Sequence, residues 1–194
     1  MPRRFAFALL CAALSAPPAL AQDAAPHSQL EALHAAKPGA PVKDTPVVLD
    51  AAFDPSTKVD GQVLQVLFGE RAVFTLGADL APVLVAAEKG QLAVAHPEGT
   101  ATETFTKPEP GQLAVALDGS AEKQASYLRI WNSLDYPVAY QVILVTLRGG
   151  KLVARPGKAC AAPAKGARYE IWPQPVVAVA LSKFSRAASA QACG

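Results

Sequence analysis

The chain has 194 residues, of which 51% are hydrophobic and 18% are charged, and its formal net charge is +2. This length suits one domain, or at most two small ones, and is enough to bury an independent core. The apolar fraction is too high and the net charge too low for a wholly disordered chain. Outside the N-terminus, no apolar run approaches the ~20 residues that a membrane-spanning helix needs.

Residues 1–21 read MPRRFAFALLCAALSAPPALA and have the pattern of a secretory signal peptide. Arg3 and Arg4 form a positive start, and the apolar stretch Phe5–Leu14 follows them. The segment ends in the small-x-small pattern Ala19-Leu20-Ala21, which a signal peptidase accepts. We therefore predict an exported protein, periplasmic or secreted, that is cut after Ala21.

A membrane anchor and a lipoprotein signal are the two other interpretations of this segment. Pro17 and Pro18 would break an anchoring helix before it could span the bilayer. Cys11 is preceded by the bulky Leu10, where a lipoprotein signal needs a small residue. Both observations favour an ordinary cleaved signal peptide, so we expect no transmembrane anchor in the mature chain.

The charge balance of the mature chain argues against two classes of partner. The whole chain has 18 basic and 16 acidic residues, and residues 1–21 hold two arginines and no acidic residue. Cleavage therefore leaves 16 basic and 16 acidic side chains, a formal net charge of zero. A neutral chain has no general attraction for nucleic acid or for an anionic membrane, so we predict no nucleic-acid binding.

The mature chain keeps two cysteines, Cys160 and Cys193. An even pair in an exported protein most simply forms one disulfide, here closing a loop of about 33 residues. The alternative, a redox-active pair, usually requires a Cys-x-x-Cys spacing, which is absent. Lys158, Lys165 and Arg168 flank Cys160, and we interpret them as a solvated basic loop.

Residues 22–45 are rich in Ala and Pro and contain no strand-like run. Ser28 and Glu31 have the spacing of a helix capping box, and Leu30 and Leu33 could share one helical face. A helix of fewer than three turns is too short to be stable alone. We predict a flexible arm, or a short helix that orders only against another surface.

From residue 46 onward the pattern changes to short runs rich in Val, Leu and Phe, separated by Gly, Pro, Asp and Lys. The runs lie at 47–53, 62–68, 72–76, 83–87, 91–95, 101–106, 112–118, 127–132, 138–147, 151–154, 169–172 and 176–184. Short strands at this spacing, with no amphipathic helix between them, favour an antiparallel sandwich or barrel. A parallel sheet is excluded because it would need crossover helices. We predict an all-β fold, an antiparallel sandwich of about ten strands over 46–194.

The run at 138–147 (VAYQVILVTL) is apolar on both alternating faces, which predicts a strand covered on both sides over its middle. Gly149 and Gly150 follow it and precede another strand-like run. A Gly-Gly pair in this position is typical of a two-residue hairpin turn.

The stretch SYLRIWNSLDYPVAYQVILV, residues 126–145, resembles the strand–turn–strand of immunoglobulin-like domains in bacterial envelope proteins. In those domains a polar residue such as Asn ends one strand, and a Pro with an aromatic residue starts the next. Asn132, Pro137 and Tyr140 occupy these positions here. The resemblance implies an immunoglobulin-like sandwich and does not extend to a specific family.

The sequence has few residues of the types that usually act in catalysis or bind metal ions. His27 and His34 lie in the arm, seven residues apart, and His96 precedes Pro97 in a predicted loop. This set lacks the spacing of a metal site, and Met1 is the only methionine. There is no Gly-x-Ser-x-Gly elbow and no phosphate-binding loop. We predict no catalytic residues, no metal and no cofactor.

The segment YEIWPQP offers the most distinctive local sequence of the C-terminal third. In one interpretation Trp172 is a core ring within a pair of strands. In the other, Tyr169, Trp172, Pro173 and Pro175 form an exposed aromatic-proline edge that contacts a partner, because Tyr and Trp bury much area for few rotamers.

These observations favour a non-catalytic binding or assembly protein of the bacterial cell envelope, with an envelope protein as its possible partner. A small-ligand module for carbohydrate or metal is the alternative. A periplasmic hydrolase is the last alternative, and loss of turnover on replacing His96 or Glu98 would support it. The oligomeric state is left open.

Overall fold

The structure is a computed structural model that describes residues 47–48, 55–95 and 101–193. These residues form thirteen strands, and no helix occurs among them. The predicted signal peptide (1–21), the arm (22–45) and His96 with Glu98 lie outside the described residues. In the part of the chain that is described, no helix is long and apolar enough to cross a membrane.

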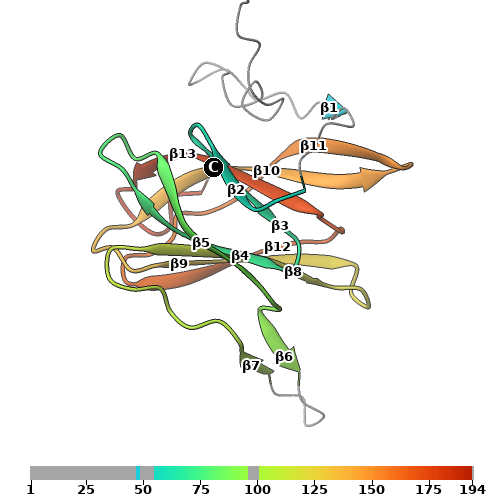
Figure 1. Cartoon of the computed structure of the whole chain (residues 1–194), viewed down its shortest axis with the longest axis horizontal. Coiled ribbons are helices and arrows are strands. Elements are labelled where there is room, and N and C mark those ends of the chain that lie inside the picture. Colours follow the sequence, from blue (N-terminus) through green and yellow to red (C-terminus); the bar gives the residue numbers. More distant parts are fainter. Residues whose placement is uncertain (1–46, 49–54, 96–100, 194) are drawn as a thin grey trace, which may run out of the picture.

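Two antiparallel sheets are stacked face to face, which confirms the predicted sandwich architecture (Figure 1). The six-stranded sheet has the order β1 (Val47–Val48), β11 (Lys151–Gly157), β10 (Val138–Arg148), β13 (Ala178–Arg186), β3 (Val63–Leu67) and β2 (Lys58–Asp60). The five-stranded sheet has the order β12 (Gly166–Trp172), β9 (Ala125–Asn132), β8 (Leu113–Ser120), β4 (Glu70–Leu76) and β5 (Pro82–Lys89). A small hairpin of β6 (Ala93–Ala95) and β7 (Ala101–Glu103) lies beyond the five-stranded sheet (Figure 1).

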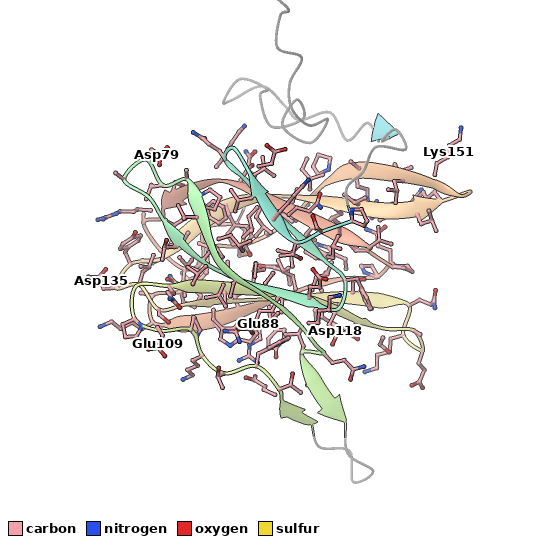
Figure 2. The ribbon with its side chains drawn as sticks, in the orientation of Figure 1. Asp79, Glu88, Glu109, Asp118, Asp135 and Lys151 are labelled. Atoms are coloured by element: carbon pink, nitrogen blue, oxygen red, sulfur yellow. A yellow bond between two sulfur atoms is a disulfide. The ribbon has the colours of Figure 1, made fainter. Side chains whose placement is uncertain are left out.

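The core fills the space between the two sheets, where Figure 2 shows closely packed side chains. Its largest fully buried members are aliphatic or aromatic and include Phe74, Leu64, Leu113, Leu117, Leu128, Ile130, Leu144 and Leu181. The rings of Phe74 and Phe184 lie 5.5 Å apart between centroids, one from each sheet. Apolar side chains at every second strand position therefore account for the stacking of the sheets.

The hairpin and the two-sided strand predicted from the sequence are both present. Gly149 and Gly150 connect β10 to β11 with φ values of 55° and 75°, which glycine adopts without steric cost. On β10, Leu144 faces the core between the sheets, whereas Ile143 and Val145 belong to a second apolar cluster on the opposite face. Both faces of the middle of β10 are thus buried.

The predicted disulfide joins Cys160 to Cys193. Beside it, the Ala161 amide donates to the Ala192 carbonyl at 2.7 Å. The Arg168 guanidinium donates to the Ala190 carbonyl, also at 2.7 Å. The C-terminal tail is therefore fastened to the loop before β12 by a covalent bond and by hydrogen bonds.

One described strand, β2, was not predicted from the sequence. Its three residues, Lys-Val-Asp, contain a single apolar side chain and no run that would indicate a strand. The strand forms because Val59 pairs with Leu64 of β3 across a tight turn at Gly61.

Candidate functional site

The outer face of the five-stranded sheet carries a row of arginine and aromatic side chains. Arg129 and Trp131 lie two residues apart on β9, so both point to the same face of the sheet. Arg129 is the register partner of Tyr169 on the edge strand β12. Arg71 reaches the same face from β4.

These side chains stack alternately, aromatic ring against guanidinium. The Arg71 guanidinium carbon lies 5.2 Å from the Phe105 ring centroid and 5.3 Å from that of Trp131. On the other side, the Arg129 guanidinium carbon lies 4.8 Å from the Trp131 centroid and 4.6 Å from that of Tyr169. The order across the sheet is therefore Phe105, Arg71, Trp131, Arg129, Tyr169, and each cation is held between two rings.

Two carboxylates balance the two arginines. Arg71 Nη1 lies 3.3 Å from a Glu88 oxygen, and Arg129 forms an ion pair with Glu103. Arg71 is only 2% exposed, and burial lowers the pKa of its guanidinium, an effect that the Glu88 carboxylate opposes. The two carboxylates thus balance the charge of the two arginines, and Trp131 lies at the centre of the stack between the two guanidinium groups.

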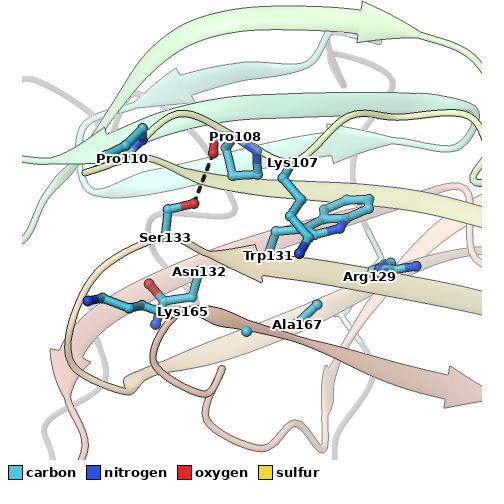
Figure 3. A pocket seen from close by; sticks show the side chains of 10 residues that line it. Lys107, Pro108, Pro110, Arg129, Trp131, Asn132, Ser133, Lys165 and Ala167 are labelled. Carbon is cyan, nitrogen blue, oxygen red and sulfur yellow. Dashed lines mark hydrogen bonds between the residues drawn. The ribbon is translucent and has the colours of Figure 1, made fainter.

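A pocket of about 590 Å³ opens beside this stack, at the end where β9 leaves the sheet (Figure 3). Three chain segments form it: the loop before β8, the end of β9, and the start of β12. Its lining consists of Lys107, Pro108, Pro110, Arg129, Trp131, Asn132, Ser133, Lys165, Gly166 and Ala167. In Figure 3 the Lys107 side chain runs down beside the Trp131 indole.

Hydrogen bonds fix the three segments relative to one another. The Ser133 hydroxyl donates to the Pro108 carbonyl at 3.0 Å, and the Ser133 amide donates to the Gln112 carbonyl at 3.0 Å. The Lys165 amide donates to the Leu134 carbonyl at 2.9 Å. These three bonds join the loop before β8, the end of β9 and the segment before β12 into one pocket wall.

The polar groups of the lining are donors and cations. Lys107 and Lys165 are exposed, and no acidic side chain of the described residues forms an ion pair with either. Two buried N–H groups, Trp131 Nε1 and Arg129 Nε, have no hydrogen-bond partner. None of the ten lining residues is acidic. The pocket therefore carries positive charge without an acidic side chain to balance it, and the two buried N–H groups are not accessible from it.

The structure separates the four residues of the predicted aromatic-proline edge. Tyr169 is 48% exposed, and Pro173 and Pro175 are also exposed. Trp172 is only 7% exposed and packs in the core between the sheets, as the core interpretation expects. It lies there because it is three residues from Tyr169 on β12, an odd step that turns its side chain to the inner face.

The site residues predicted from the sequence do not include Arg71, Arg129, Trp131 or Lys107, and Lys165 is predicted to lie in a solvated basic loop. The spacing Tyr-x-Arg-x-Trp at 127–131 is the one available signal, because alternate positions of a strand share a face. Lys107 and Lys165 lie far apart in the sequence, and only the tertiary structure brings both to one pocket.

Within the described residues, no group of three or more His, Cys, Asp or Glu side chains could hold a metal ion. Comparison with protein-family models, curated protein sequences and solved structures gives no significant match to this chain. The function therefore has to be inferred from the site itself.

Proposed function

We propose that this protein is an exported, non-catalytic binding protein of the bacterial cell envelope, and that the pocket beside Trp131 binds a small organic carboxylate. The observation that carries the proposal is the pair of exposed lysines, Lys107 and Lys165, in a pocket whose lining has no acidic side chain. An anionic ligand would balance the two ammonium charges through charge-assisted hydrogen bonds.

The chemistry of the lining indicates the class of ligand. A carboxylate accepts charge-assisted hydrogen bonds from ammonium groups such as those of Lys107 and Lys165, and bonds of this kind are the stronger ones. The faces of Pro108, Pro110 and Trp131 provide apolar contact for the rest of the ligand. A carboxylate attached to a hydrocarbon or sugar ring fits both requirements, and a bare inorganic anion would leave the apolar surface unused.

Export and the immunoglobulin-like character of the domain are part of the same proposal. The signal-peptide pattern of residues 1–21 and the Cys160–Cys193 disulfide support export, because disulfides persist in oxidising compartments. The stacking of two antiparallel sheets supports an immunoglobulin-like domain. Ser133 donates its hydroxyl hydrogen to the Pro108 carbonyl, and no His, Asp or Glu side chain of the lining could activate it. In this proposal Lys107 and Lys165 bind the charge of the ligand.

The test is a binding measurement on the purified mature protein by calorimetry. The probes are D-glucuronate, L-glutamate and citrate at millimolar concentration, with D-glucose as the uncharged comparison. We expect at least one carboxylate to bind and D-glucose not to bind. Absence of binding by all three carboxylates would overturn the proposal.

Variants locate the binding site. Lys107→Gln with Lys165→Gln should weaken binding about tenfold or more, since tenfold corresponds to about 1.4 kcal/mol. Trp131→Phe keeps a ring but reduces the apolar surface of the pocket wall, and it should weaken binding to a smaller extent. Lys151→Gln at the tip of the β10–β11 hairpin is the matched control (Figure 2). If all these variants bind the carboxylate as tightly as the wild-type protein does, the carboxylate binds at another site on the protein.

An envelope protein partner on the edge strand β12 is the second candidate function. Tyr169 and Ile171 are 48% and 63% exposed there, next to the exposed Pro173 and Pro175. In-cell crosslinking of the tagged protein, followed by mass spectrometry, tests it. A single reproducible envelope partner, lost on replacing Tyr169 and Ile171 with Ser, would support this candidate.

A further inference from the structure

Strand β12 forms one edge of the five-stranded sheet, and none of the described strands pairs with its outward side. It pairs with β9 over all of its 7 residues, without a register shift. On its outer face, Ile171 is 63% exposed and Tyr169 is 48% exposed. A regular edge strand with exposed apolar side chains is a template for pairing with another strand.

The other edges of the two stacked sheets, as far as the structure describes them, have features that discourage such pairing. At the opposite edge of the same sheet, β5 contains Pro82 and Lys89 and has a register shift against β4. The six-stranded sheet ends in β1 and β2, which have 2 and 3 residues. Proline, lysine, bulges and very short strands are common ways in which proteins protect a sheet edge. β12 has none of these features.

The inner side of β12 carries two charges of opposite sign, Arg168 and Glu170. The Arg168 guanidinium donates to the Ala190 carbonyl at 2.7 Å, within the same chain. A Glu170 oxygen accepts from the Cys160 amide at 2.8 Å. A guanidinium has five N–H donors and a carboxylate has two oxygens, so both groups can bond to a second partner. Charges at a sheet edge oppose pairing unless the incoming strand places opposite charges against them.

A second copy of β12 provides those charges when the two strands pair antiparallel about a two-fold axis at Tyr169. The axis is perpendicular to the sheet, so the inner and outer faces of the two copies stay aligned. Residues equally far from Tyr169 then lie opposite each other. Arg168 lies opposite the partner's Glu170, and Glu170 lies opposite the partner's Arg168. On the outer face, Ile171 lies opposite the partner's Ala167, and the two Tyr169 side chains meet at the axis.

This register is the only one that joins all 7 residues of both strands. A shift by one residue would set inner side chains opposite outer ones. A shift by two would place Arg168 opposite the partner's Arg168, or Glu170 opposite the partner's Glu170. Like charges directly opposite each other are destabilising. β12 is therefore complementary to itself, in charge and over its full length, in one register.

We propose that this protein forms a two-fold symmetric dimer in which β12 pairs antiparallel with β12 of a second copy, so that the five-stranded sheets of both copies join into one. The pairing buries Tyr169 and Ile171 and gives partners to the outward N–H and C=O groups of β12. The second copy occupies the edge that the second candidate function assigns to an envelope protein. Dimerisation needs no ligand in the carboxylate pocket, so the two proposals can fail separately.

Sedimentation velocity of the purified mature protein, over a series of micromolar concentrations, tests for the dimer. We expect the mass to rise from that of one chain to that of two, and a monomer at every concentration would overturn the proposal. Ile171→Lys places a charge at the paired edge and should weaken the dimer about tenfold or more. Val83→Lys is the matched control, because Val83 is 52% exposed on the opposite edge strand. If both variants dimerise equally well, β12 is not the interface.

Two charge-reversal variants test the register of the dimer. Arg168→Glu and Glu170→Arg each place like charges opposite each other, so each variant alone should dimerise about tenfold more weakly or worse. When the two variants are mixed, both opposite-charge pairs return, and we expect a dimer with one chain of each. Circular dichroism measures whether each variant is folded. Folded variants that stay monomeric when mixed, or that dimerise alone as tightly as wild type, would overturn the proposal. If either variant is unfolded, the comparison of Ile171→Lys with Val83→Lys decides.

Discussion

The Arg71 guanidinium carbon lies 5.3 Å from the ring centroid of Trp131, between that ring and Phe105. Arg71 is 2% exposed and has Glu88 as its ion-pair partner. A charge this deeply buried persists in proteins when it is both paired and packed. The contact also fixes the indole that forms one wall of the pocket.

Replacing Arg71 with Lys should destabilise the protein. Lysine keeps the charge but loses the planar group that stacks between two rings, so we expect a loss of about 1–3 kcal/mol in the free energy of unfolding. Urea denaturation at neutral pH measures it. Arg71→Met keeps an apolar stem and removes the buried charge, so it should cost less than the lysine variant. A lysine variant as stable as wild type would show that the stacking contributes nothing.

Tyr140 has a buried hydroxyl without a hydrogen-bond partner, and burial raises the pKa of this group well above its usual value of about 10. The unfolded chain therefore releases the tyrosine proton first as the pH rises. Above about pH 10 this difference lowers the free energy of unfolding.

Tyr140→Phe should therefore reduce the fall in stability at alkaline pH. At neutral pH the variant should be as stable as wild type or more stable by up to about 1 kcal/mol, because the unpartnered hydroxyl is removed. Urea denaturation at a series of pH values from 7 to about 11 compares the two proteins across the expected transition. An unchanged alkaline slope would contradict the prediction.

The disulfide between Cys160 and Cys193 should contribute strongly to stability. Closing this loop of 33 residues restricts the unfolded chain by about 3–4 kcal/mol in the chain-entropy model. The double variant Cys160→Ala, Cys193→Ala should lose about this amount in urea denaturation. Dithiothreitol should destabilise wild type and leave the double variant unchanged. A loss in the double variant below about 1 kcal/mol would mean that the tail is held mainly by its hydrogen bonds.

Gly119 on β8 is a position where even one methyl group should be harmful. A Cβ atom there would lie 2.7 Å from the Ala125 carbonyl oxygen and 2.9 Å from a ring carbon of Phe68. Gly119→Ala should therefore cost about 1–3 kcal/mol through overpacking. Ser120→Ala, at the next residue, loses one hydrogen bond from the Lys123 amide and should cost less than about 1.5 kcal/mol. Thermal unfolding of both variants gives the comparison.

Much of the fold could be predicted because its signals are local. Alternating apolar residues in 138–147 indicated a two-sided strand, and Gly149-Gly150 indicated its turn. The disulfide followed from there being two cysteines in the predicted mature chain. Strand β2 escaped prediction because its pairing with β3, and not its own composition, makes it a strand.

The candidate site could not be predicted in the same way. Lys107, Trp131 and Lys165 are separated by more than twenty residues from one another, and each has an ordinary sequence context. Strand periodicity determines which face of the sheet a side chain occupies, and it places Trp172 on the face that forms the core. It carries no information on which strands become neighbours. Near neighbours along the chain were enough to predict most of the strands and turns, and the count of cysteines in the predicted mature chain was enough to predict the disulfide. The tertiary structure alone decided that two lysines, an unpartnered indole and a stacked arginine meet in one pocket, because that requires the order of strands across a sheet.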